Sequence, residues 1–268
     1  MKYDAFIFDV DGVLLDTSTS FNQAVLLAVK TATGSNRFTK HFISTLKGIP
    51  GFNNDWNVAI AGAAWIESGD SVPFSEFVNR LNRYGGGLKA LKKIISSLSV
   101  SFQQSITKLV MEAYGGTSAC KQLYGFEPET IHIEGTWKNE TAFISPEKIR
   151  PYLPISGIVS GRNRTEMDLA FKLLGWEIPA QRVAISDDAQ LDKPNPKKLI
   201  SIINTMGSEN PVFLGDTRDD MELVKNVVRE TGKQMDFCCV GNQNGINNFD
   251  YQVETVLQFF EKMETANG

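Results

Sequence analysis

Cysteine and histidine are scarce in this 268-residue sequence, which contains three cysteines and two histidines. The odd cysteine count and the absence of metal-ligand spacing among Cys120, Cys238 and Cys239 argue against a disulfide framework and favour a reducing compartment. No motif surrounds His41 or His132, so we expect neither of them to be a catalytic group or a ligand.

Long apolar runs and an excess of positive charge are also missing. No run reaches the roughly 18 apolar residues that a membrane-spanning helix needs. The N-terminus leads directly into an apolar strand, without the pattern of a signal peptide. The net charge of −4 argues against nucleic acid as the main partner, because phosphate backbones attract basic surfaces. We therefore expect a cytoplasmic protein that binds neither membranes nor nucleic acid.

The composition, with 42% hydrophobic and 22% charged residues, is that of an ordinary globular protein. Near its start, the apolar run 5–8 predicts a buried strand of a parallel sheet, and Asp9, Asp11 and Gly12 follow it. Side-chain alternation places both carboxylates on one side, at the strand end where open α/β sheets bind ligands. Taken alone, however, a strand followed by an Asp-Gly turn explains this stretch better.

The hydrophobic pattern divides the rest of the chain in two. Residues 17–140 show helical stripes at 21–32, 74–81, 88–98 and 102–113, the last of which ends before Gly115-Gly116. They show no convincing strand, and 117–140 give no clear assignment. From 141 onward, helices alternate with apolar runs at 155–159, 183–185, 212–214 and 237–240, which predicts a parallel sheet that includes 5–8. We therefore expect an α/β core of residues 1–16 and 141–268, interrupted by an all-helical domain, 17–140.

Polar residues follow three of these later strands. Each has a simple structural explanation by itself: Ser160 as a helix cap, Lys193 as a solvated side chain, and Asp219 and Asp220 as acids at a helix N-terminus. Together they are harder to dismiss, because the parallel strands would bring them to one edge of the sheet. So many carboxylates need a cation, and oxygen ligands favour Mg²⁺, which also binds substrate phosphate. The converging residues are Asp9, Asp11, Ser160, Lys193, Asp216 and Asp220.

Four ordered motifs carry a family resemblance. The sequence D-V-D-G-V at Asp9–Val13, the strand-ending Ser160, Lys193-Pro194, and G-D-T-R-D-D at Gly215–Asp220 resemble those of the haloacid dehalogenase superfamily, whose core is a Rossmann-like parallel sheet. The helical insert after the first motif resembles the cap domain of its phosphoglycolate phosphatase and β-phosphoglucomutase branch. The resemblance covers the core, and it covers the insert only in position and helix content.

This resemblance implies a Mg²⁺-dependent phosphatase acting on a small phosphorylated metabolite. Asp9 would attack phosphorus and form an aspartyl-phosphate, while Asp11 would act as general acid and base. Ser160, the Gly161 amide and Lys193 would hold the phosphoryl oxygens. The implied Mg²⁺ ligands are Asp9, the backbone carbonyl of Asp11, and Asp216, with direct or indirect support from Asp219 or Asp220. The insert would act as a moving lid.

Two other functions stay open on the sequence. A phosphomutase acting on a sugar phosphate would share all four motifs, and a non-catalytic phosphate-binding regulatory protein could share the fold. A phospho-accepting receiver domain fits poorly, because it has no place for the long insert or for the Asp9-x-Asp11 spacing. As the resemblance has it, the aspartate at position 11 favours a phosphate over a haloacid substrate.

Overall fold

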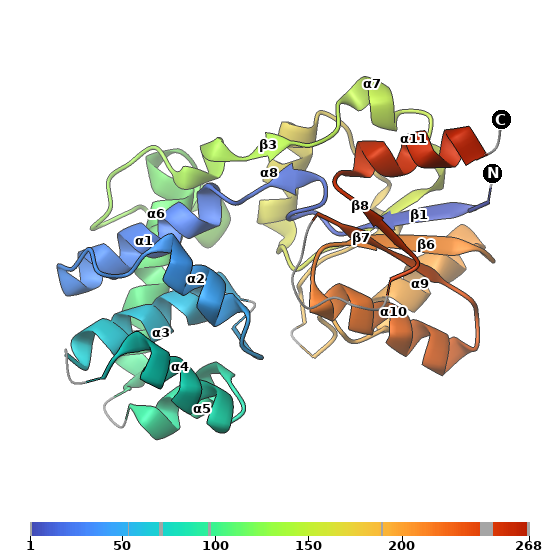
Figure 1. Cartoon of the computed structure of the whole chain (residues 1–268). Helices are drawn as coiled ribbons and strands as arrows, with labels where there is room; N and C mark the ends of the chain where they lie inside the picture. Colours follow the sequence, from blue (N-terminus) through green and yellow to red (C-terminus); the bar gives the residue numbers. More distant parts are fainter. Residues whose placement is uncertain are drawn as a thin grey trace. The chain divides into compact units, whose positions relative to one another are not determined.

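The computed structural model describes residues 2–52, 54–69, 72–95, 98–188, 190–241 and 249–266. They belong to two compact units, one within residues 1–16 and 141–268 and the other within residues 17–140 (Figure 1). The first unit is α/β and the second is helical. Of the helices in these described ranges, none combines the length and apolar character that crossing a membrane requires.

The α/β unit is built on a six-stranded sheet in the order β5-β4-β1-β6-β7-β8, with every neighbouring pair parallel. The central strand β1 is fully buried, which explains its continuous apolar sequence. The predicted parallel sheet is therefore confirmed, and β8 is an additional strand that the sequence pattern did not predict. The strands are β1 (Ala5–Phe8), β4 (Ser156–Val159), β5 (Val183–Ala184), β6 (Pro211–Gly215), β7 (Asp236–Val240) and β8 (Tyr251–Val253).

Helices cover both faces of this sheet (Figure 1). Because side chains alternate along a strand, Phe6 and Phe8 pack into one core with α7, α8 and α11, whereas Ile7 packs into a second core with α9 and α10. Short 3₁₀ helices, η2 (Leu153–Ile155) and η3 (Ala180–Arg182), precede β4 and β5. The helices are α7 (Pro146–Ile149), α8 (Arg164–Leu174), α9 (Lys197–Met206), α10 (Arg218–Thr231) and α11 (Val256–Ala266).

A small two-stranded antiparallel sheet lies where the chain leaves the α/β unit and returns to it. Strands β2 (Leu15–Asp16) and β3 (Thr141–Ala142) pair through Leu15 with Ala142 and Asp16 with Thr141. Neither strand was predicted, because two residues carry no periodicity. This pairing joins two segments that are far apart in the sequence.

In its described residues, the helical unit contains six α-helices, the 3₁₀ helix η1 and no strand. Four α-helices fall in the predicted segments, whereas α2 and α3 did not appear in the sequence pattern. The core helix α3 is buried on all sides from Val58 to Trp65, so it lacks the one-sided stripe that reveals a helix. The elements are α1 (Ser20–Thr33), α2 (Lys40–Lys47), α3 (Asp55–Glu67), α4 (Phe74–Arg83), α5 (Gly87–Ile94), α6 (Val100–Tyr124) and η1 (Thr136–Asn139).

Helix α6 extends further than its sequence pattern indicated. The apolar stripe predicted an end at Gly115-Gly116, but the helix continues to Tyr124 beyond a kink where Gly116 has φ 56° and ψ −164°. The next segment is held by Glu112, whose buried carboxylate accepts the backbone N–H groups of Glu129, Thr130 and Ile131 at 2.9–3.1 Å. Long-range bonds of this kind explain why residues 117–140 were not readable from the sequence.

Candidate active site

The carboxyl ends of three adjacent strands bring polar residues to one edge of the sheet. Asp9 follows β1, Ser160 follows β4 and Asp216 follows β6, and β1 lies between the other two strands. The backbone N–H of Asp9 still donates to the carbonyl of Leu214 at 2.9 Å, so the ladder fixes its position. The connections turn to opposite sides of β1, which makes this edge a topological switch point, the usual ligand site of open α/β sheets.

One lysine joins two buried carboxylates at this edge. The ammonium of Lys193 lies 2.8 Å from Asp9 Oδ2 and 2.8 Å from Asp220 Oδ1. The second oxygen of Asp220 caps α10, where it accepts the hydroxyl and the N–H of Thr217 at 2.6 and 3.0 Å. The helix cap therefore holds Asp220, and Asp220 in turn helps to hold Lys193 against Asp9.

A third carboxylate, Asp216, completes the group. Ligand oxygens of Asp9, Asp216 and Asp220 all lie within 4.8 Å of one another; among the described residues, Asp219 is not part of this group. Asp216 packs tightly over the turn after Asp9, since a Cβ added to Gly12 would lie 2.1 Å from Asp216 Oδ2. With φ 76°, Gly12 also adopts a conformation that favours glycine, so both the turn and the close approach require it.

The charges in this group are unbalanced. Burial, reinforced by Asp220 and Asp9, raises the pKa of Asp216 well above its ordinary value. Burial likewise raises the pKa of Asp9 to about 7, against the opposing effect of Lys193. Burial alone would lower the pKa of Lys193, but the charges of Asp220 and Asp9 outweigh it and raise that pKa. Three carboxylates therefore share one ammonium, which leaves two negative charges over when all are ionised.

The carboxylate oxygens of this group suit a divalent cation. Asp216 Oδ1 is buried and has no hydrogen-bond partner among the described residues, although buried polar atoms normally have one. A hard cation such as Mg²⁺ prefers carboxylate oxygens and would supply both the missing partner and the missing charge. The observed oxygens thus suit the ion predicted from the sequence.

Asp11 has a different partner from Asp9. Its Oδ1 oxygen accepts hydrogen bonds from Nε and Nη2 of Arg162, at 2.9 and 2.6 Å. Arg162 was not predicted as a site residue. Its position two residues after Ser160 was the available signal, but nothing local distinguished it from a surface arginine.

The two remaining predicted residues lie in the turn between β4 and α8. Ser160 is buried, and its hydroxyl accepts the backbone N–H of Arg162 at 3.1 Å. Gly161 is exposed beside it. The structure thus places Ser160 and Gly161 at the end of the strand next to β1, and it groups Asp9, Lys193, Asp216 and Asp220 directly.

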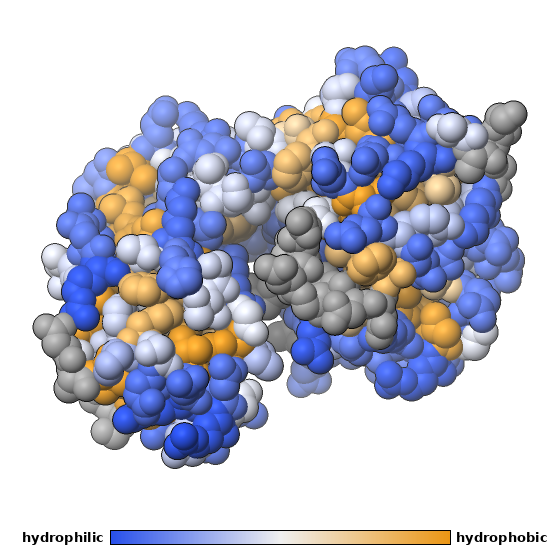
Figure 2. Space-filling model, viewed as in Figure 1, coloured by the Kyte–Doolittle hydropathy of each residue, from blue (hydrophilic) through white to orange (hydrophobic). Residues whose placement is uncertain are grey.

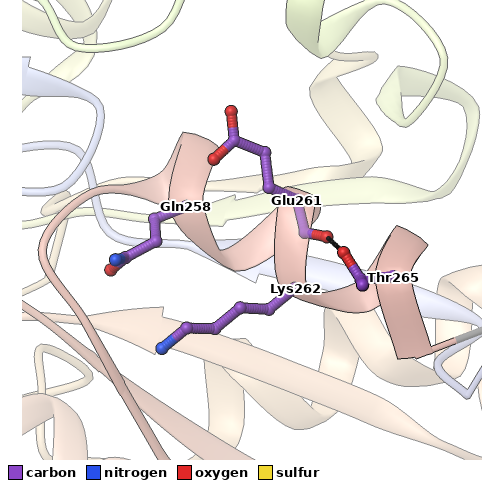
Figure 3. Close-up of a pocket in the computed structure, with 4 residues that line it drawn as sticks. All are labelled: Gln258, Glu261, Lys262 and Thr265. Carbon is purple, nitrogen blue, oxygen red and sulfur yellow. Dashed lines mark hydrogen bonds between the residues drawn. The ribbon is translucent and has the colours of Figure 1, made fainter.

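A separate pocket of about 490 Å³ lies along α11 (Figure 3). Its lining residues, Gln258, Glu261, Lys262 and Thr265, all belong to that one helix, and the surface there is mainly hydrophilic (Figure 2). Glu261 points away from Lys262, so the charged groups do not converge on a common point (Figure 3). The pocket therefore lacks the convergent groups that the carboxylate cluster has.

The fold of the chain is similar to that of several solved structures. No protein-family model and no curated protein matches the chain. Among solved structures, it is similar to a phosphatase from Thermococcus thioreducens, with TM-score 0.73, 22% identity, and coverage of 96% of this chain and 98% of that one. A predicted phosphoglycolate phosphatase from Haemophilus somnus gives TM-score 0.58 and 12% identity, covering 98% and 99% of the two chains.

A third similar structure is a haloacid dehalogenase superfamily hydrolase of subfamily IA from Geobacter sulfurreducens. Its TM-score is 0.52 at 14% identity, with 98% of this chain and 97% of that chain covered. At these identities the likeness establishes the fold, and the sequence-based expectation of that fold is confirmed. The chain has the fold of the haloacid dehalogenase superfamily hydrolases.

Proposed function

We propose that this protein is a Mg²⁺-dependent phosphatase that hydrolyses the phosphate monoester of a small metabolite through an aspartyl-phosphate. The observation that carries the proposal is the buried carboxylate of Asp9 at the end of the central strand, within 2.8 Å of Lys193 and beside Asp216 and Asp220. A carboxylate, a fixed cation and a metal-binding acidic group are what nucleophilic phosphoryl transfer requires. The similar solved phosphatases support this reaction class.

In the first step, a carboxylate oxygen of Asp9 forms a bond to phosphorus while the bond from phosphorus to the substrate alcohol breaks. Asp11 gives its proton to the departing alkoxide. In the second step, water attacks the phosphorus of the acyl phosphate, Asp11 takes a proton from that water, and phosphate leaves with Asp9 regenerated. Asp11 thus ends each cycle protonated again, ready to act as acid.

The remaining residues stabilise charge. Ser160, the Gly161 amide and Lys193 would hold the phosphoryl oxygens. Asp9, Asp216 and the Asp11 backbone carbonyl would bind Mg²⁺, supported by Asp220 and not by Asp219. When bound, Mg²⁺ would offset negative charge on the phosphoryl group. Such transfer depends mainly on positioning and charge stabilisation.

The test is phosphate release from a panel of phosphate monoesters that includes sugar 1-phosphates, with Mg²⁺ and after chelation of metal. We expect release that requires the metal and is abolished in Asp9→Asn. Asp168→Asn, an exposed aspartate on α8, is the matched control and should behave as wild type. Isomerised sugar phosphate without net release would identify a phosphomutase instead. Binding without turnover of any ester would contradict an enzymatic role.

A further inference from the structure

Arg162 is a deeply buried arginine that pairs with a partly exposed carboxylate. Its side chain is only 1% exposed, whereas the carboxylate that it binds, on Asp11, is 34% exposed. Burying a guanidinium costs free energy unless its charge is compensated. Here the arginine is enclosed in the protein and holds a carboxylate that stays open to solvent.

The arginine itself is firmly held. Its Nη1 donates to the carbonyl of Glu166 in the first turn of α8 at 3.3 Å, and its backbone N–H donates to Ser160 Oγ. Residues Asn163 and Glu166 form a capping box directly after it, which fixes the start of α8. The guanidinium therefore has a defined place relative to the end of β4.

Two donors of Arg162 reach the same oxygen of Asp11. Nε and Nη2 converge on Oδ1, so the contact sets the orientation of the carboxylate and leaves Oδ2 outside it. The neighbouring nucleophile is held by a different cation, since Lys193 contacts Asp9 and Asp220. Each of the two aspartates thus has its own basic residue, and Asp11 stays outside the carboxylate cluster.

We propose that Arg162 is a positioning residue for Asp11, which it anchors through Oδ1 so that Oδ2 exchanges the proton with the leaving group and with water. The proposal rests on the phosphatase function above. It assigns Arg162 no contact with substrate. Its loss should therefore impair only the proton transfers that Asp11 performs.

Leaving-group dependence gives the test. Arg162→Met should lower kcat for an alkyl phosphate such as glycerol phosphate about 10–100-fold, the range found when a group that orients a metal ligand is removed. Formation of p-nitrophenolate from p-nitrophenyl phosphate should fall less in a pre-steady-state burst, because that leaving group needs little protonation. KM should change little, and Arg162→Lys, which keeps a donor, should recover part of the loss.

A double-mutant cycle separates positioning from general damage. In an Asp11→Asn background, Arg162→Met should change kcat by less than about 3-fold, because the residue it positions is already disabled. Arg164→Met, at an exposed position two residues further along at the start of α8, is the control and should retain wild-type kinetics. If Arg162→Met does not fold by circular dichroism, Arg162→Gln and Arg162→Lys provide the same comparison.

Two results would overturn the inference in distinguishable ways. Equal losses for both leaving groups, additive with Asp11→Asn, would show that Arg162 only supports the fold while the phosphatase function stands. Absence of phosphate release from every ester by the wild-type protein would overturn the function, and the positioning role would be overturned with it.

Discussion

Buried acids dominate the chemistry at the scale of single residues. Asp9 and Asp220 are both almost fully buried and both contact the Lys193 ammonium at 2.8 Å. Removing one partner of a buried ion pair leaves an uncompensated charge, which is far more costly than exchanging the whole pair for apolar groups. Lys193 therefore has a structural role that can be measured without any substrate.

We expect Lys193→Met to lower the free energy of unfolding by about 3–5 kcal/mol in metal-free buffer. Mg²⁺ should then raise the melting temperature of the variant more than that of the wild type, because a bound cation compensates the same carboxylates. Thermal denaturation with and without Mg²⁺ measures both effects. Lys197→Met, at an exposed position on α9, is the control. Identical Mg²⁺-induced shifts in wild type and Lys193→Met would contradict the expected role.

The hydrogen bonds of Asp4, away from the carboxylate cluster, should make the stability of the fold depend on pH. Its carboxylate accepts hydrogen bonds from the Ser208 hydroxyl and from the N–H groups of Glu209 and Asn210. Partial burial alone would raise the pKa of Asp4, but these three hydrogen bonds outweigh it and lower that pKa. The bonds therefore stabilise the fold above the unfolded-state pKa of about 3.9. This stabilisation is lost as the pH falls through the lower, folded-state pKa.

Asp4→Asn should lower the free energy of unfolding by roughly 0.5–1 kcal/mol at pH 7, since an amide cannot accept all three bonds but solvent screens this exposed side chain. The difference from wild type should shrink as the pH falls below 4, because wild-type Asp4 then becomes protonated. Urea denaturation of both proteins between pH 7 and pH 3 makes the comparison. A difference that stays constant over this range would contradict the assignment.

Helix α6 was the element of the helical unit whose end was hardest to predict, and its kink depends on the backbone conformation of Gly116. At the kink of α6, a Cβ on Gly116 would lie 2.2 Å from the backbone nitrogen of Gly135. The φ and ψ of Gly116 also fall in a region that residues with side chains essentially avoid. The kink of α6 and the close approach of the chain at Gly135 therefore both require glycine at position 116.

Gly116→Ala should therefore destabilise the protein by about 3–5 kcal/mol, through backbone strain together with the clash. Gly34→Ala is a matched control, because Gly34 also has a positive φ of 67° but its added Cβ would meet no atom within 4 Å. That control should cost only about 1–2 kcal/mol. Chemical denaturation of the two variants tests the difference, and equal costs would show that the close approach to Gly135 is unimportant.

Long elements with a clear period were predictable from the sequence, and contacts between distant residues were not. The strands β1, β4, β6 and β7 are buried apolar runs, and the polar residues after the first three could be placed at one sheet edge by topology alone. Arg162 could not be identified, because its partner Asp11 lies 151 residues away. The choice between Asp219 and Asp220 also depends on burial in the folded chain, since both lie in the first turn of α10.

At the scale of the whole molecule, the chain forms one unit built on a parallel sheet and a second unit built of helices. All residues assigned to phosphoryl transfer belong to the α/β unit, although the sequence that forms it is interrupted by residues 17–140. The sheet brings together side chains from four separate parts of the sequence: Asp9 and Asp11, Ser160, Lys193, and Asp216 with Asp220. The proposed reaction, in which Asp9 is the nucleophile that attacks phosphorus, therefore depends on the fold of the whole α/β unit.

The most direct measurement is the mass of the protein after rapid quenching of its reaction with p-nitrophenyl phosphate. In Asp11→Asn, turnover should fall by about 10²–10⁴-fold, because acid–base assistance is lost. This leaving group needs little protonation, so the acyl phosphate should still form and should accumulate as one added phosphoryl group on the peptide that contains Asp9. Asp9→Asn should show no added mass and no turnover. A phosphoryl group found on Ser160, or near-normal turnover in Asp9→Asn, would contradict Asp9 as the nucleophile.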